Sequence, residues 1–262
     1  MSADLPQTFG RYQVIKLLGS GMQGETFLAD DGSGREVAIK TIHSSQVGQS
    51  KTHRALDKEV VALSAVNPAF VPKFIESNST GERPYYVMEY IQGTTVDGLI
   101  AERGQLTDVQ VQRLAIRLAA SLVAMHSVGV AHGDFRGQNL IVGTDGGIYV
   151  LDFGRAELRT DSRHEFYKRR QSDLRQFGEL IVRARNGRGP FGEDSSLAIE
   201  RYNEGRPDLG ALSGRTRHVA AELLRRHPMR RGPDAKRVYR VLLYGRRARR
   251  RVWLGTPSSL SE

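Results

Sequence analysis

Short runs of alternating apolar and polar positions dominate the first ninety residues, and this pattern predicts β-strands. Strand-like runs cover residues 11–18, 26–30, 36–42, 70–77 and 84–91. Residues 51–66 instead repeat their apolar positions at helical spacing. This part of the chain therefore predicts a five-stranded antiparallel sheet with one helix.

From Gly93 onward the apolar positions follow the helical period. Residues 107–129 predict a long amphipathic helix, whose start Thr107 or Asp108 can cap. Two short β-like runs come next, joined by the turn sequence GTDGG, and helical runs return from Ser172. The whole pattern predicts an α+β fold with an N-terminal extension at 1–10, a small lobe at 11–92, a larger and mainly helical lobe at 93–245, and a basic, Ser-rich tail at 246–262.

Composition excludes several classes of protein. The chain has 262 residues and no Cys, so a secreted disulfide scaffold and a Cys-based zinc site are both excluded. No apolar run approaches the roughly 18 residues that a membrane-spanning helix needs, and the N-terminus lacks a signal-peptide pattern. We therefore expect a cytoplasmic protein without a membrane span.

Charge is unevenly divided along the chain. Residues 1–154 carry a net charge of −3 and residues 155–262 a net charge of +13, so the whole basic excess lies in the C-terminal part. Most of the cations are Arg, which makes bidentate contacts to carboxylates and phosphates. This excess indicates an anionic partner, such as an acidic protein substrate, or else a solvated basic face. A nucleic acid or anionic surface bound by the Arg run at 246–251 is a further hypothesis, which we favour less than a solvated tail.

Glycines at positions 19, 21 and 24 form a G-x-G-x-x-G pattern between two predicted strands. A glycine hairpin lets backbone N–H groups approach phosphates closely, because no Cβ intervenes. A dinucleotide-binding fingerprint would instead lead from a strand into a helix. Lys40 follows on the third predicted strand, and Glu59 on the predicted helix can pair with it, so that the ammonium group faces phosphate oxygens.

Acidic and amide side chains follow in two loops. Asp134 and Asn139 lie in the sequence HGDFRGQN after the long helix, and Asp152 ends the next hairpin in LDFG. An aspartate there can accept a hydroxyl proton, and amide and carboxylate oxygens bind hard cations. Each motif alone is also ordinary turn or surface chemistry. The glycine pattern, Lys40, Glu59 and these two motifs together, in this order, have no comparable structural explanation.

In this order the motifs resemble those of eukaryotic-type (Hanks-type) protein kinases, and the chain is similar to bacterial Ser/Thr kinases in particular. The resemblance covers residues 11–245, nearly the whole chain. Residues 172–178 resemble the start of the large-lobe helix whose aspartate, Asp173 here, anchors the catalytic loop. A later segment resembles the motif that ends in a buried arginine, which makes Arg231 the matching position.

The resemblance implies a bilobal protein-kinase-like fold that binds ATP and Mg²⁺, with Mn²⁺ as an alternative ion. It assigns the phosphate-binding and catalytic positions to Gly19, Gly21, Gly24, Lys40, Glu59, Asp134 and Arg136, and the metal ligands to Asn139 and Asp152. It assigns the adenine site to Leu18, Thr26, Ala38, Met88, Glu89, Ile91 and Leu140. In this assignment Asp134 is the catalytic base, and Lys40 holds the phosphates while paired with Glu59.

The chain departs from the family pattern around the substrate segment. Gly133 replaces the arginine usual before the catalytic aspartate, and Arg136 replaces a lysine. Only 21 positions separate Asp152 from Asp173, without an Ala-Pro-Glu motif, so we expect an unusually short activation segment. A trimmed loop needs no arginine to order it, and we do not expect loop phosphorylation to be the switch. The role of Arg231 stays open, because the missing motif would supply its glutamate partner.

We therefore expect an ATP- and Mg²⁺-dependent protein kinase that phosphorylates Ser or Thr hydroxyls of a protein substrate, since every residue that the chemistry needs is present. The His-Gly-Asp sequence and the short substrate segment leave a kinase of small molecules or carbohydrates as an alternative. A nucleotide-binding pseudokinase-like scaffold is the third hypothesis, and the retention of all catalytic residues argues against it.

Overall fold

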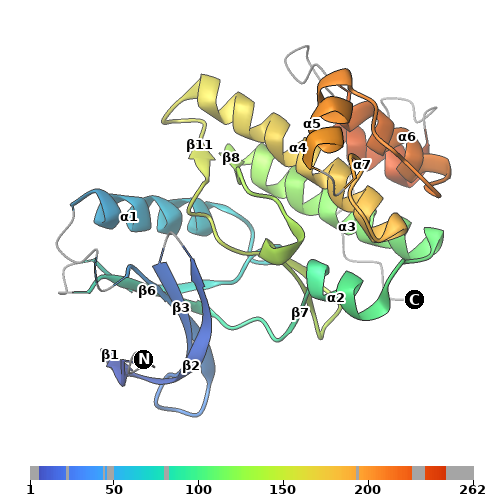
Figure 1. Cartoon of the computed structure of the whole chain (residues 1–262). Helices are drawn as coiled ribbons and strands as arrows, with labels where there is room; N and C mark the ends of the chain where they lie inside the picture. Colours follow the sequence, from blue (N-terminus) through green and yellow to red (C-terminus); the bar gives the residue numbers. More distant parts are fainter. Residues whose placement is uncertain are drawn as a thin grey trace.

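The computed structural model describes residues 6–21, 24–43, 45, 50–79, 83–192, 195–225 and 234–245. Within these ranges the chain forms a sheet-rich N-terminal part and a helical C-terminal part, which lie side by side in Figure 1. The predicted α+β, bilobal architecture is confirmed. Arg231 and the basic tail at 246–262 lie outside the described residues.

The N-terminal part is an antiparallel sheet with the strand order β1-β2-β3-β4-β6-β5. The strands are β1 (Thr8–Phe9), β2 (Tyr12–Gly21), β3 (Gly24–Asp30), β4 (Glu36–Thr41), β5 (Phe74–Asn78) and β6 (Tyr85–Glu89). The five predicted strands are confirmed, but the predicted number is wrong, because β1 adds a sixth. Phe9 is buried and packs on the rings of Phe27 and Tyr85, so the sheet begins before the predicted start of the small lobe.

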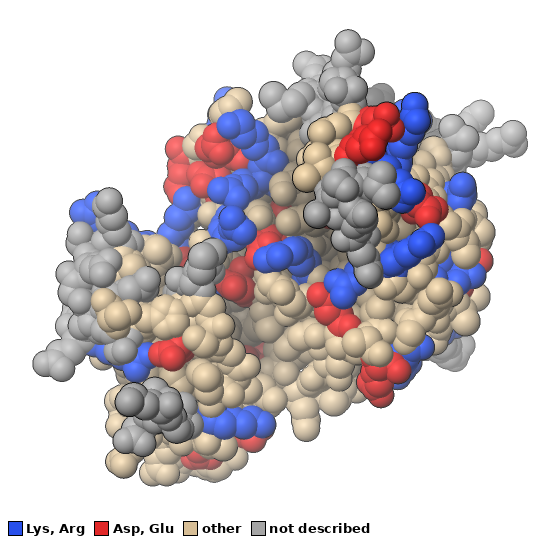
Figure 2. Space-filling view, viewed as in Figure 1, with Lys and Arg blue, Asp and Glu red and all other residues tan. Residues whose placement is uncertain are grey.

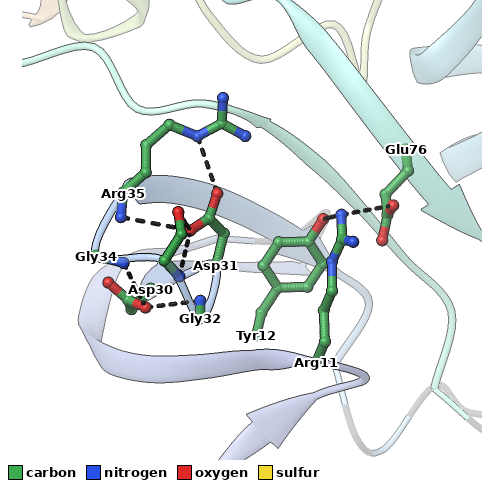
Figure 3. A network of polar contacts seen from close by, with 9 residues as sticks. Arg11, Tyr12, Asp30, Asp31, Gly32, Gly34, Arg35 and Glu76 are labelled. Carbon is green, nitrogen blue, oxygen red and sulfur yellow. Dashed lines mark hydrogen bonds and ion pairs between the residues drawn. The ribbon is translucent and has the colours of Figure 1, made fainter.

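Polar contacts fix the outer end of this sheet (Figure 3). Asp30 accepts the backbone N–H of Gly32 at 2.7 Å, and Asp31 pairs with Arg35 at 3.0 Å, which closes the turn between β3 and β4. At the start of β2, Arg11 lies 3.2 Å from Glu76 of β5. These exposed contacts close the β3–β4 turn and join the start of β2 to β5.

One helix packs on the sheet, as predicted. Helix α1 (Ser50–Ala65) lies along one face of it and contacts β5 and β6 (Figure 1). Leu56 and Leu63 are buried in the same hydrophobic cluster as Phe135 and Phe153 of the helical part. The core is therefore continuous between the two parts.

The C-terminal part combines helices with short strand pairs. Its helices are α2 (Val96–Arg103), α3 (Asp108–Ser127), α4 (Arg163–Asn186), α5 (Ser195–Glu204), α6 (Gly214–Leu223) and α7 (Ala235–Tyr244). Its strands are β7 (Gly93–Thr95), β8 (Val130–Ala131), β9 (Leu140–Gly143), β10 (Ile148–Val150) and β11 (Glu157–Leu158). β9 pairs with β10 and β7, and β8 pairs with β11. Among the described helices, none is both long and apolar enough to cross a bilayer.

Helix α3 forms where the sequence predicted it and is capped by Thr107. The Thr107 hydroxyl accepts the backbone N–H of Gln110, and the Gln110 side chain accepts the N–H of Thr107, which is a complete capping box. Its inner face buries Leu118, Leu122 and Met125 completely. Helix α3 therefore forms the centre of the helical part.

Helix α4 begins earlier than the sequence indicated. It starts at Arg163, where the Ser162 hydroxyl accepts the N–H of Glu165, and not near Ser172. Its first nine residues, RHEFYKRRQ, bury only Phe166 and Gln171, so they lack the apolar stripe on which the prediction depended. As a result, only residues 153–162 connect Asp152 to this helix.

Candidate active site

A cleft of about 720 Å³ lies between the sheet and the helical part. Figure 2 shows it as a hollow with Asp or Glu atoms inside. Most of the predicted site residues line this cleft: Leu18, Gly19, Gly21, Gly24, Thr26, Ala38, Lys40, Met88, Glu89, Ile91, Asp134, Arg136, Asn139 and Asp152. Motifs that are far apart in the sequence thus meet in one place.

Lys40 is held between two carboxylates at the inner wall of the cleft. Its Nζ lies 2.8 Å from an oxygen of Glu59 and 2.6 Å from an oxygen of Asp152. Lys40 projects from β4 and Glu59 from α1, and both side chains are buried. Tyr86 of β6 donates its hydroxyl hydrogen to Glu59 at 3.0 Å. Helix α1 is therefore docked with Glu59 in contact with Lys40.

Burial and charge act in opposite directions on this trio. Burial lowers the pKa of Lys40, but the charges of Glu59 and Asp152 outweigh it, so the pKa lies above its usual value. Burial raises the pKa of Glu59, and Lys40 offsets this only in part. For Asp152 burial also acts upward, but the contact with Lys40 outweighs it and lowers the pKa. The lysine is thus kept charged in an apolar setting.

The loop that carries Asp134 is fixed by a carboxylate from α4. Asp173 is fully buried and accepts the backbone N–H groups of His132 at 2.9 Å and of Gly133 at 2.7 Å. The ring of His126, in the last turn of α3, lies 2.9 Å from the same carboxylate. The anchoring contact that the resemblance assigned to Asp173 is therefore present.

His132 connects this loop to the segment that carries Asp152. Its Nδ1 accepts the backbone N–H of Asp134 at 3.2 Å, so its Nε2 carries the hydrogen and donates to the carbonyl oxygen of Leu151 at 2.8 Å. Phe153 is buried and packs edge-on against the ring of His132. The loop that carries Asp134 and the segment that carries Asp152 are therefore held together through His132.

Both oxygens of Asp134 have partners. Arg136 Nε lies 2.6 Å from Oδ1, and its Nη2 lies 2.9 Å from Oδ2. Hydrogen bonding to Asp134 raises the pKa of Arg136 above its usual value. Asn139 donates its Nδ2 hydrogens to the Asp134 carbonyl oxygen at 2.9 Å and to Oδ2 at 3.2 Å. Within the described ranges no group donates a hydrogen bond to the Asn139 side-chain oxygen.

Asp152 adopts a left-handed backbone conformation. Its φ is +63°, and it is the one non-glycine residue with positive φ in the described part of the chain. Its Oδ1 accepts the N–H of Gly154 at 3.2 Å, which stabilises the turn. Strain of this kind persists where the surroundings impose it. Here it turns the Asp152 carboxylate into the cleft, toward Lys40.

The three glycines of the hairpin differ in what they require. Gly24 has a φ of +135°, and a Cβ there would overlap the carbonyl oxygen of Thr41, so its glycine is explained by backbone packing. A Cβ at Gly19 or Gly21 would meet nothing within 4 Å. These two glycines leave open space at the cleft. Met22 and Gln23, between them and Gly24, lie outside the described residues.

The assignment of Leu140 to the adenine site is wrong by one position. Leu140 is completely buried in the core beneath the cleft, and its neighbour Ile141 lines the cleft. Both belong to β9, where successive side chains point to opposite faces of the sheet. A shift of one residue along β9 therefore named a side chain on the core face of the strand in place of the one on its cleft face.

The departure at Gly133 has a steric explanation. Its φ is +78°, and a Cβ there would overlap the carbonyl oxygen of Arg155. The Cδ of Arg169, from α4, lies 3.1 Å from the same position. The short segment after Asp152 therefore brings its backbone and α4 into the space where an arginine side chain would begin.

Several cleft residues were not found from the sequence. Thr95, Gln138, Ile141 and Arg155 also line the cleft, and Tyr86 contacts Glu59 behind it. Two of them carried a signal: Gln138 lies within the HGDFRGQN motif, and Arg155 directly follows the LDFG motif.

Comparisons with known proteins agree with this geometry. Residues 12–175 match the protein kinase domain family. The chain is 26% identical over 243 residues to the probable serine/threonine-protein kinase PkwA of Thermomonospora curvata, covering 85% of this chain and 33% of that protein. It is 26% identical over 232 residues to the probable serine/threonine-protein kinase PknB of Bifidobacterium longum, covering 76% of this chain and 34% of that protein.

A third relative is the serine/threonine-protein kinase AfsK of Streptomyces griseus, 28% identical over 158 residues, which are 60% of this chain and 20% of that protein. The chain spans between a fifth and about a third of the length of these relatives. The family match covers more than half of the chain. The chain belongs to the protein kinase family.

Proposed function

We propose that the chain is an ATP- and Mg²⁺-dependent protein kinase that transfers the γ-phosphoryl group to Ser or Thr hydroxyls of a protein substrate. One observation carries the proposal: Lys40, which is ion-paired with Glu59 and Asp152, lines the same cleft as Asp134, Asn139 and Asp152. The names of the relatives, which are serine/threonine-protein kinases, support the hydroxyl class.

The upper and lower walls of the cleft suit a purine nucleotide. Leu18 and Ala38 from the sheet and Ile141 from β9 supply apolar surfaces on opposite sides. Met88 and the segment from Glu89 to Ile91 form the edge, where backbone groups can bond the base. Lys40, kept charged by its two carboxylates, would bind phosphate oxygens. Gly19 and Gly21 leave room for the phosphates.

The donor set also suits a magnesium ion. Asp152 offers a carboxylate whose pKa lies below its usual value, and Asn139 offers its side-chain oxygen. Bound there, Mg²⁺ would neutralise charge on the transferring phosphate. Among the described residues no cluster of three or more His, Asp or Glu side chains forms a separate metal cage. A shared site of protein and phosphate oxygens fits this pair of ligands.

Asp134 and Arg136 have complementary parts in the proposed transfer. The acceptor oxygen attacks the γ-phosphorus, the bond from that phosphorus to the ADP oxygen breaks, and the acceptor proton passes to Asp134. Both Asp134 oxygens are bonded by Arg136 in the structure. Each carboxylate oxygen retains a further lone pair, so an acceptor hydroxyl can bond Asp134 while the guanidinium still holds it. Arg136 would thus orient the base and then stabilise the transferring charge.

Transfer from labelled ATP tests the proposal. The full chain, with Mg²⁺ and a generic protein acceptor, should incorporate phosphate, and Asp134→Asn should lower the rate by about 10²- to 10⁴-fold. Asp145→Asn, in the exposed turn between β9 and β10, is the matched control and should retain the rate. Chelation of the metal should abolish transfer. Equal incorporation by wild type and Asp134→Asn would reject Asp134 as the base. Phosphotyrosine as the product would reject Ser and Thr as the acceptor residues.

A second candidate function is phosphorylation of a small molecule or carbohydrate. It is favoured by the ten-residue connection from Asp152 to α4, which leaves little chain for docking a peptide. An assay of ADP release with pools of hydroxylated small molecules tests it. Release that depends on such a compound, with no labelling of protein, would select this candidate over the first.

A further inference from the structure

Four arginines lie in the short segment after Asp152 and in the start of α4. We name Arg155, Arg159, Arg163 and Arg169 the basic rim. Arg155 lines the cleft, Arg159 directly follows β11, and the other two project from the first turns of α4. Figure 2 shows Lys and Arg atoms gathered over β11 and the start of α4, beside the hollow.

The basic rim carries uncompensated charge. Residues 155–170 contain six Lys or Arg and three Asp or Glu, a net charge of +3. All three carboxylates are taken by lysines. Lys58 contacts Glu157 at 3.1 Å and Asp161 at 3.2 Å, and Lys168 contacts Glu165 at 2.8 Å. Within the described parts of the chain, none of the four rim arginines has a carboxylate within ion-pair distance.

The rim is next to the catalytic loop. The carbonyl oxygen of Arg155 and the Cδ of Arg169 both pack against Gly133, the residue before Asp134. Arg159 donates its backbone N–H to Gly129 at 2.8 Å, at the end of the turn that leads into this loop. Two of the four rim residues therefore contact the residue before Asp134, and Arg155 also lines the cleft.

We propose that the basic rim binds acidic residues of the protein acceptor that flank the phosphorylated Ser or Thr. The proposal rests on the proposed kinase function and names its substrate class. Exposed guanidinium groups form bidentate hydrogen bonds with carboxylates and with phosphate groups. The +13 charge of residues 155–262 indicated an anionic partner without locating it. The rim gives that partner a place, next to Asp134.

The chemistry of the rim favours a peptide over a nucleic acid or an anionic membrane. Glu157, Asp161 and Glu165 alternate with the rim arginines along the chain. Closely spaced phosphates would meet these carboxylates as well as the arginines, and like charges in close contact are unfavourable. A peptide with a few separated carboxylates can contact the arginines and avoid the acidic positions.

The experiment compares three peptides of equal length around one Ser: flanked by Asp and Glu, by Ala, or by Lys. Binding of labelled peptide to the full chain is measured by fluorescence anisotropy without ATP, and transfer is measured separately. The double variant Arg159→Gln/Arg163→Gln removes two exposed rim charges. Arg113→Gln is the matched control. Arg113 is exposed and lies near the start of α3. The Arg185–Asp108 ion pair shows that the C-terminal end of α4 lies there, whereas the rim lies at the start of α4.

We expect the acidic peptide to bind about tenfold more tightly than the Ala peptide at low salt, and the double variant to lose most of this preference. The preference should weaken as salt rises, since the rim is exposed. The control should keep it. Equal binding of the three peptides, or an unchanged preference in the double variant, would overturn the proposal. Equally tight, rim-dependent binding of duplex DNA or anionic vesicles would overturn the assignment to an acceptor.

The two proposals fail in different ways. Rim-dependent binding of the acidic peptide without phosphate transfer would reject the kinase function and retain the rim as a peptide site. Transfer to acidic and Ala peptides with equal KM, unaffected by the double variant, would retain the kinase and reject the rim.

Discussion

At the scale of single residues, Lys40 sets the charge balance of the cleft. Among the described residues it is the one cation in contact with both Glu59 and Asp152, and its own side chain is only 6% exposed. An uncompensated charge in such a place is costly, because burial removes hydration that nothing replaces. The stability of the trio therefore depends on each of its members.

The first prediction follows from the sign of these pKa shifts. In the wild type the lowered pKa of Asp152 contributes stability above its unfolded pKa, which is lost as pH falls. In Lys40→Met both carboxylates lose their cation, so both folded pKa values rise and stability falls as pH rises above about 4. We expect a deficit in the free energy of unfolding of about 3 kcal/mol at pH 7.5 and a smaller one at pH 5, measured by urea unfolding.

The control for this prediction is Lys168→Met, which removes an exposed lysine paired with Glu165. It should cost less than about 1 kcal/mol at either pH. A Lys40→Met deficit that is equal at the two pH values would contradict the electrostatic account.

At the scale of elements, α4 organises the helical part of the site. It contacts α3, α6, β8 and β11, and Asp173 in its middle binds the loop of Asp134. Its C-terminus closes on Gly187, whose φ of +73° suits only glycine without strain. The helix thus connects the turn after β11 to the base of the catalytic loop.

The second prediction concerns this anchor. Asp173→Ala leaves the N–H groups of His132 and Gly133 without their acceptor in a buried setting, and each such loss costs about 1–3 kcal/mol. We therefore expect a loss of about 2–5 kcal/mol in urea unfolding, together with a large fall in kcat. Glu165→Ala on the same helix should lose less than about 1 kcal/mol. A stable Asp173→Ala variant with normal kcat would show that the loop is held by other contacts.

The sequence predicted the elements with a strong apolar period and missed those without one. Strands β2 to β6 and helix α3 follow their apolar runs, and the cleft residues at motif positions could be named in advance. The start of α4 could not, because RHEFYKRRQ is held by contacts with the catalytic loop and by a cap rather than by an apolar stripe. Leu140 was misassigned because strand parity at β9 is a property of the folded sheet.

The steric reason for a glycine at position 133 could not be predicted from the sequence either. Its cause is the approach of Arg155 and Arg169, two residues far from it along the chain. Local pattern shows that a glycine is unusual at this position, but only the folded chain shows what fills the space.

At the scale of the whole molecule, the two parts are joined across the cleft by ion pairs as well as by the core. Lys58 projects from α1 in the sheet-rich part and contacts Glu157 of β11 and Asp161 beyond it. Its side chain is 37% exposed, so each contact is weak and screened by salt. These contacts bear on catalysis because Glu59 is the next residue on α1.

The third prediction is that Lys58→Ala weakens nucleotide binding without unfolding the chain. We expect an ATP-analogue affinity about two- to fivefold lower at 0.05 M salt, and a difference that shrinks at 0.5 M salt, as measured by calorimetry. Arg54→Ala, an exposed change on the same helix, should leave the affinity unchanged. An effect that is independent of salt would assign Lys58 a packing role instead.

The uninterrupted run of α4 from Arg163 to Asp173 has a mechanical consequence. These eleven residues span about 15 Å of continuous helix. One end carries an arginine of the basic rim, and the other holds the backbone before Asp134. A displacement imposed on the rim is therefore transmitted to the catalytic loop as the movement of a rigid rod. An acceptor that docks on the rim as proposed would therefore align Asp134 in the same event, through the helix itself.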